Sequence, residues 1–242
     1  FQYTENLKKV TFQSAMEWKT SNSYGDIFSY SSVEEVILSD KMTTLSPNMF
    51  DNAKQLRIVS YNDYVIKNQA DYEAGFENAL PPQVTVAPYE LFNNCESLKS
   101  MDMSNITSYA FYSSSSTGNY NGVFSGCTSL EEVTLNSTLD AIPGKMFLNC
   151  TSLESLPVTI FDSMKKISTA SKTFSGCTAF TGESPYTMVQ DGEQQVKVHL
   201  YERTNYPDIF GAKIFTTASS YKDTFKGCTQ MADYAEIPVS YT

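Results

Sequence analysis

One short motif recurs along this chain and restricts its fold more than any other feature. The motif is Phe-x-x-Cys-x-x-(Leu, Phe or Met), and all five cysteines of the chain occupy the same place in it. Because unrelated cysteines would not fall on one position of one motif by chance, the motif marks an internal repeat. Its anchors are Phe92, Cys95, Leu98, Phe124, Cys127, Leu130, Phe147, Cys150, Leu153, Phe174, Cys177, Phe225 and Cys228.

Two further copies of the motif are degenerate. Residues 50–56 carry Ala53 where the cysteine would stand, and residues 28–33 are one residue shorter. After each copy, apolar residues alternate with polar ones, as in Val133 and Leu135, and this pattern predicts a short strand with one buried face. One coil cannot bury its own apolar edge, so we expect stacked coils with continuous columns of Phe, Cys and Leu.

The full pattern, F-x-x-C-x-x-L-x-x-φ-x-φ followed by I-P-x-x-x-F, resembles the BspA-like leucine-rich repeat of bacterial cell-surface proteins, which is frequent in gut Bacteroidetes. The closest copies lie 23 residues apart, from Cys127 to Cys150, and leucine-rich repeats are about 20–29 residues long. The resemblance covers most of the chain. It implies a repeat solenoid, a right-handed superhelix with short parallel β-strands, a turn-rich convex side and little regular helix.

The repeat predicts one domain over residues 1–242. Three stretches depart from the pattern and are expected to be insertions, at about 61–85, 105–123 and 181–224, and residues 225–242 resemble a C-terminal cap. Whether 181–224 hides an additional coil stays open. Residues 7–12 look like the second half of a truncated first repeat, which suggests that a signal or anchor segment is missing from this sequence.

Charge and hydropathy exclude several classes of function. The net charge is −10, which disfavours nucleic acid, because neutralising phosphates needs clustered Lys and Arg. No stretch approaches the 18 apolar residues of a transmembrane helix, so we expect no membrane span. These features are typical of a secreted or cell-surface protein.

The residues offer little for catalysis or cofactors. His199 is the only histidine, and it lies in an alternating, strand-like run where a structural role is the ordinary explanation. The cysteines are expected to be buried free thiols, although a disulfide framework is the alternative for an exported protein. No zinc-ligand spacing and no phosphate-binding loop occurs, so the sequence predicts no metal, no cofactor and no enzyme.

Acidic pairs are the remaining candidates for chemistry. Glu34 with Glu35, Glu131 with Glu132, and Glu154 could serve glycoside hydrolysis, but they fall between the buried positions of the repeat and are expected to be solvated. A weak calcium site at 191–193 is the other possibility, although it lacks the ligand count of an EF-hand loop.

Tyrosines in the insertions are the candidate ligand-binding residues. Tyr and Ser together form an adaptable contact surface, of the composition found in antibody paratopes. The alternative is that these aromatic side chains only pack the insertions against the coils. The candidates are Tyr64 and Tyr72 in the first insertion and Tyr109, Tyr112 and Tyr120 in the second.

The face of the strands is a weaker candidate. The register of the repeat places small, mixed and mildly acidic residues there, without an aromatic platform or a basic stripe. The expected face residues are Lys9, Thr11, Glu35, Ile37, Ile58, Ser60, Ser100, Asp102, Glu132, Thr134, Ser155 and Pro157.

The resemblance implies a non-enzymatic binding or adhesion module at the cell surface, or secreted, whose partners are proteins such as host matrix proteins or other cell surfaces. The identity of the partner and the oligomeric state are not determined. Two other functions stay open: a structural spacer within a larger surface protein, and a carbohydrate-binding accessory protein.

Overall fold

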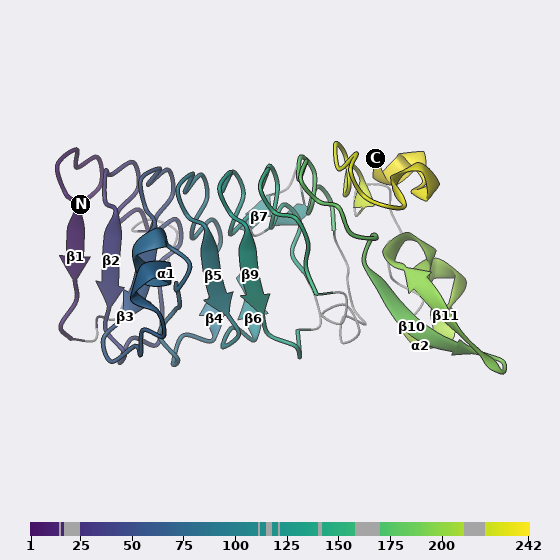
Figure 1. The fold of residues 1–242 in the computed structure, drawn as a ribbon, viewed down its shortest axis with the longest axis horizontal. Helices are drawn as coiled ribbons and strands as arrows, with labels where there is room; N and C mark the ends of the chain where they lie inside the picture. Colours follow the sequence, from purple (N-terminus) through teal and green to yellow (C-terminus); the bar gives the residue numbers. More distant parts are fainter. Residues whose placement is uncertain are drawn as a thin grey trace.

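The computed structural model describes residues 1–14, 16, 25–110, 112–114, 118–120, 122–139, 142–157, 170–210 and 221–242. Trp18 lies outside these residues. The coils follow one another side by side along the long axis of the molecule, with the two ends of the chain at opposite ends of the row (Figure 1).

Short parallel strands run across one face of this row. β1 (Lys9–Thr11), β2 (Glu35–Leu38) and β3 (Ile58–Tyr61) form a parallel sheet, and β5 (Ser100–Met103) pairs in parallel with β9 (Glu132–Leu135). The apolar residues of the repeat register with one another across the coils, and their side chains point into the core. A second parallel pair joins β4 (Val86–Ala87) and β6 (Ser108–Tyr109).

The remaining elements lie outside the repeat. They are helix α1 (Gln69–Ala74), the antiparallel hairpin of β7 (Tyr112–Ser114) and β8 (Gly118–Tyr120), the antiparallel hairpin of β10 (Tyr186–Asp191) and β11 (Gln194–His199), the 3-10 helices η2 (Leu200–Asn205), η3 (Tyr234–Glu236) and η4 (Val239–Tyr241), and helix α2 (Pro207–Phe210).

The phenylalanine of each copy stacks on the phenylalanine of the next. Neighbouring rings lie 5.4–5.8 Å apart and within 16° of parallel, and all but the outermost are buried in the core. The stack runs through Phe1, Phe28, Phe50, Phe92, Phe124, Phe147, Phe174 and Phe225.

The last step of the stack answers the question of the long insertion. Phe174 and Phe225 are in direct contact at 5.7 Å, although 51 residues separate them in the sequence. No coil therefore intervenes between them. The described part of 181–224 leaves the row instead, as the β10–β11 hairpin followed by η2 and α2 (Figure 1).

The cysteines tie each coil to the one before it. Every cysteine is a free, buried thiol, and its Sγ donates to the carbonyl oxygen of the phenylalanine of the preceding coil at 2.8–3.2 Å. A thiol is small enough for the core and is still a weak donor, which explains why cysteine occupies this place. Burial raises the pKa of all five thiols.

The residue before each cysteine adopts a left-handed backbone. Its φ is 55° at Asn94, 77° at Gly126, 60° at Asn149, 80° at Gly176 and 82° at Gly227, and Asn52, before Ala53 in the degenerate copy, has a φ of 56°. Asn and Gly are the residues that tolerate this region best, which explains the Asn-Cys and Gly-Cys pairs of the sequence. The turn then lets the cysteine amide donate back to the carbonyl of the phenylalanine three residues earlier.

Asn78 joins the two parts of the parallel sheet. Its Oδ1 accepts from the amide of Val59 in β3 at 2.9 Å, and its Nδ2 donates to the carbonyl of Ser100 in β5 at 3.1 Å. The same Nδ2 lies within bonding distance of the carbonyls of Arg57 and Gly75. Strands β3 and β5 do not pair directly with each other. Asn78, which is 3% exposed, lies between them and hydrogen-bonds to both.

The left-handed turns can be tested by Gly126→Ala. A Cβ on Gly126 would lie 2.1 Å from Oδ1 of Asn94, whereas a Cβ on Gly227 would lie 3.7 Å from its nearest neighbour in Gly176. Either alanine costs roughly 1 kcal/mol of backbone strain, and we expect about 1–3 kcal/mol more for the clash at Gly126. Urea unfolding measures both variants, and equal losses would contradict this account.

The bridging role of Asn78 predicts that Asn78→Ala lowers the free energy of unfolding by roughly 3 kcal/mol or more, because several buried backbone groups lose their partner. Asn62→Ala is the control, since Asn62 makes one bond, from its Nδ2 to the carbonyl of Phe12. We expect a loss of about 1 kcal/mol there. Chemical denaturation of the two variants would show no difference if Asn78 did not join the strands.

The buried thiols predict a loss of stability at alkaline pH. Folding raises the thiol pKa above the value of 9.0 for an unperturbed cysteine, to about 12 for Cys228. The stabilisation is therefore complete below pH 9 and is lost as the pH rises toward the folded pKa, by about 1.4 kcal/mol per pH unit for each thiol. Urea unfolding at a series of pH values measures this slope, and Cys127→Ala is expected to reduce it by one thiol's share. The same slope in both proteins would refute the prediction.

Candidate binding groove on the sheet face

The face of the parallel strands begins with paired charges. Lys8 contacts Glu34 at 2.7 Å and Lys9 contacts Glu35 at 2.6 Å, so each lysine of the first coil meets a glutamate of the second. These two glutamates are held in ion pairs across coils and are not a catalytic pair.

The first insertion folds across this face. Helix α1 lies in front of the strands beside β3 (Figure 1), and the hydroxyl of Tyr72 donates to Oε1 of Glu35 at 2.9 Å. Ile58 is 1% exposed, Ser60 3% and Ser100 4%. The expectation that these three residues lie on an open face is therefore wrong, because the insertion covers them.

Local sequence explains why the insertion forms a helix here. Asn68 caps the start of α1, where its Oδ1 accepts from the amide of Ala70 at 3.0 Å, and Gly75 ends the helix with a φ of 83°. Both carboxylate oxygens of Glu77 accept from the backbone amides of Lys67 and Asn68 at 2.8 Å. These two bonds close the insertion on itself, since they join the segments before and after α1.

Two hollows open on the sheet face beside this insertion. The first, of about 530 Å³, lies between the insertion and strands β5 and β9. The second, of about 410 Å³, lies between β9 and residues 155–157. Both are lined by Glu132 and Thr134, so they adjoin along the row of coils. We call the two together the sheet-face groove.

The groove combines aromatic, acidic and apolar side chains. Tyr64, Phe76 and Asp102 line the first hollow, and Val133 and Pro157 line the second. Burial raises the pKa of Tyr64, and the nearby carboxylates Glu77 and Asp102 raise it further. Tyr64 therefore enters the groove as a neutral phenol that can donate a hydrogen bond.

The five candidate tyrosines are not brought together. Tyr64 lines the groove, and Tyr72 holds the insertion to Glu35, where burial and this bond raise its pKa to about 12. Tyr109 is only 7% exposed and belongs to the core. The backbones of Tyr112 and Tyr120 pair across the β7–β8 hairpin, and their side chains lie outside the described residues.

Part of the sheet-face groove consists of residues expected on the strand face. They include Asp102, Glu132, Thr134, Ser155 and Pro157, but the repeat by itself predicts no hollow there. The hollow exists because the insertion forms a wall beside β5. Its sequence signal is the Asn68 and Gly75 pair that brackets a short helix within the insertion.

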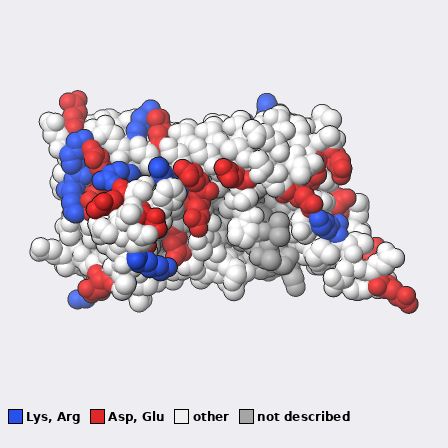
Figure 2. Space-filling view, viewed as in Figure 1, with Lys and Arg blue, Asp and Glu red and all other residues white. Residues whose placement is uncertain are grey.

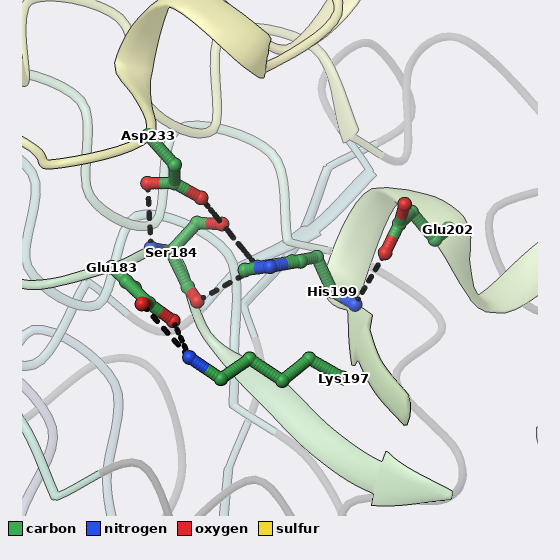
Figure 3. A network of polar contacts seen from close by, with 6 residues as sticks. All are labelled: Glu183, Ser184, Lys197, His199, Glu202 and Asp233. Carbon is green, nitrogen blue, oxygen red and sulfur yellow. Dashed lines mark hydrogen bonds and ion pairs between the residues drawn. The ribbon is translucent and has the colours of Figure 1, made fainter. Parts of the chain in front are cut away.

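The structure also places a serine, a histidine and an aspartate together near the C-terminal end (Figure 3). The hydroxyl of Ser184 donates to Asp233, and its Oγ lies 2.7 Å from Nδ1 of His199. In nucleophilic catalysis the histidine stands between the acid and the serine and uses one ring nitrogen for each. Here one ring nitrogen, Nδ1 of His199, faces both Ser184 and, at 3.5 Å, Oδ2 of Asp233, and the serine is fully buried.

This cluster therefore has a structural role. It fastens the 231–242 segment, through Asp233, to the start of the β10–β11 hairpin, through the amide and hydroxyl of Ser184. His199 ends β11, and its own amide donates to Glu202 at 2.9 Å (Figure 3). The expected structural role of His199 agrees with these contacts.

The described residues contain no group of three or more His, Cys, Asp or Glu side chains that could hold a metal ion. Residues 191–193, the candidate calcium site, form the exposed tip of the β10–β11 hairpin. Among the described residues as a whole, no helix has the length and apolar character needed to cross a bilayer.

A comparison with solved structures matches leucine-rich repeat proteins of bacteria, with TM-scores below 0.5. A leucine-rich repeat protein of T. pallidum is 18% identical with a TM-score of 0.44, and the match covers 72% of this chain and 61% of that one. A leucine-rich cell surface protein of Faecalibacterium prausnitzii A2-165 is 17% identical with a TM-score of 0.36, covering 94% of this chain and 88% of that one. A comparison with curated protein sequences gives no match.

The family comparison rests on the repeat itself. The model of the BspA type leucine-rich repeat region matches the overlapping segments 1–74, 24–122, 76–181 and 120–232, with six copies. These segments span nearly all of the chain and include every Phe-x-x-Cys motif. The chain belongs to the BspA type leucine-rich repeat family.

Proposed function

We propose that this chain is a non-enzymatic binding module, secreted or displayed at the cell surface, that recognises a protein partner through the sheet-face groove. The observation that carries the proposal is the pair of adjoining hollows that share Glu132 and Thr134. The groove is open, extends over several coils and mixes polar with apolar side chains, as protein interfaces do. Adhesion to host matrix or to other cells is the form of binding that the family resemblance implies.

The repeat supports this proposal as a scaffold. We infer that the coils form a single right-handed solenoid over residues 1–242, with the insertions on its surface and a turn-rich convex side. Such a stack presents its strand face as a continuous surface, because each coil contacts only its neighbours. The groove residues of β5 and β9 are then held in register by the strand pairing.

A structural spacer is the second candidate. The unbroken stack of phenylalanine rings favours it, because a continuous core makes the row of coils stiff. A spacer needs no groove, so the effect of blocking the groove distinguishes the two functions.

Thr134→Trp tests the proposal, since Thr134 is exposed and lines both hollows, and a tryptophan would fill the groove without adding charge. Gln194→Trp, on the exposed β11 strand, is the control. We expect binding to at least one protein in a panel of matrix proteins and glycans, measured by biolayer interferometry, with about a tenfold or greater loss for Thr134→Trp only. No protein bound above background, or equal binding by both variants, would favour the spacer.

A further inference from the structure

We propose that the groove takes an extended polypeptide segment that carries Lys or Arg side chains. This inference rests on the proposed function, since it names the kind of partner that the same groove would bind. It follows from the charges along the sheet face, from the aromatic rings of the first hollow and from the dimensions of the groove.

The charges on the sheet face change along the row of coils. In the first coils the acids are neutralised by neighbours, as in Lys8 with Glu34 and Lys9 with Glu35, and Lys54 pairs with Glu96. Figure 2 shows these coils with blue and red side chains interleaved, whereas the charged side chains in the middle of the same face are mostly red.

Within the described residues, three acids of the later coils have no cationic partner. Glu131, Glu132 and Glu154 are exposed, and none of them makes an ion pair with another described residue. Two of them occupy the same repeat positions as the paired Glu34 and Glu35. The position after the apolar anchor holds Lys8, Glu34, Arg57 and Lys99 in the earlier coils but Glu131 and Glu154 in the next two, so this position changes from mixed charge to acidic along the row.

The groove itself concentrates this charge. Glu132 stands where the two hollows adjoin, and Asp102, Asp71 and Glu77 line the first of them. Carboxylates gathered in a hollow with low-dielectric walls attract a cation more strongly than the same charges on a flat surface. Lys67 also lines the first hollow, but the four carboxylates outnumber it, so a partner with positive side chains would balance the remaining negative charge.

An ammonium group already occupies one wall of the first hollow. Nζ of Lys99 lies over the ring of Phe76, 5.0 Å from its centroid, and Phe76 lines the hollow. The ring of Tyr64 lines the same hollow, and no such ammonium contact to it occurs among the described residues. An aromatic ring beside carboxylates is a favourable place for a Lys or Arg side chain.

The dimensions of the groove fit a polypeptide better than a single ion. The hollows extend along the row over β5, β9 and residues 155–157, which are three neighbouring coils. At about 4.8 Å between strands, the two spacings that separate three coils match an extended segment of about three residues at about 3.3 Å each. Asp102 in β5 and Glu132 in β9 lie on neighbouring strands along this direction, and the described residues hold no group of three or more His, Cys, Asp or Glu that could hold a metal ion.

Fluorescence anisotropy with the whole chain tests the inference. The probes are labelled peptides of alternating Lys and Gly, and the matched peptides of Glu and Gly and of Ser and Gly. We expect only the lysine peptide to bind, and its affinity to fall as salt rises, because exposed charge pairs are screened. Unlabelled spermine serves as the competitor that separates a small polycation from a peptide.

Glu132→Gln and Glu193→Gln are the matched variants. Each removes one exposed negative charge, but Glu132 lies in the groove and Glu193 at the tip of the hairpin. We expect Glu132→Gln to weaken binding of the lysine peptide about fivefold and Glu193→Gln less than about twofold. Because both side chains are exposed, circular dichroism and the Tm should stay unchanged.

The other outcomes overturn the inference in distinguishable ways. Equal weakening by both variants would indicate attraction by the overall negative charge rather than by the groove. Spermine that competes as well as the unlabelled peptide would indicate a small cation. A protein partner that is lost with Thr134→Trp but binds Glu132→Gln as well as the unchanged chain would retain the proposed function and refute a cationic partner.

Discussion

Each coil of this protein is attached to the previous one at its phenylalanine. The ring stacks on the neighbouring ring, and the carbonyl group accepts the thiol of the next coil. A stacked pair contributes about 0.5–1.5 kcal/mol beyond the burial of its surface, and the thiol gives the carbonyl a second donor beside the amide of its own coil. The ring contact repeats at every step and the thiol contact at every step from Phe50 onward, so the order of the coils follows from one motif.

This column determines where the chain can vary. A change in the length of a coil leaves the stack intact as long as its two anchors stay in contact, and Phe174 with Phe225 is the extreme case. Extra residues are therefore expelled to the surface, where they form hairpins and short helices. The insertion after β3 is different, because Asn78 draws it back into the sheet between two strands.

The groove results from that return of the chain. A row of uninterrupted coils would present a plain strand face, whereas helix α1 covers β3 and forms a wall beside β5. The acids of β5 and β9 then stand in a hollow rather than on an open surface. The repeat places these acids on the strand face, and the insertion encloses them in one hollow.

The candidate site was only partly predictable. The register of the repeat identified Glu132 and Thr134 as face residues, because alternation along a strand depends only on the sequence. The tyrosine hypothesis selected Tyr64, which lines the groove, together with Tyr109, which is buried. Composition cannot separate these two, since a tyrosine serves equally well in a contact surface and in a core.

The sequence by itself determined the repeat, its family, its buried columns and the left-handed turns, because each depends on residues within one coil and is repeated many times. The tertiary structure alone decided which coils lie next to each other across the insertions and which part of the strand face is covered. Those features depend on contacts such as Tyr72 with Glu35 and Ser184 with Asp233. Each of these contacts occurs once, between residues far apart in the chain, so no periodic pattern in the sequence predicts it.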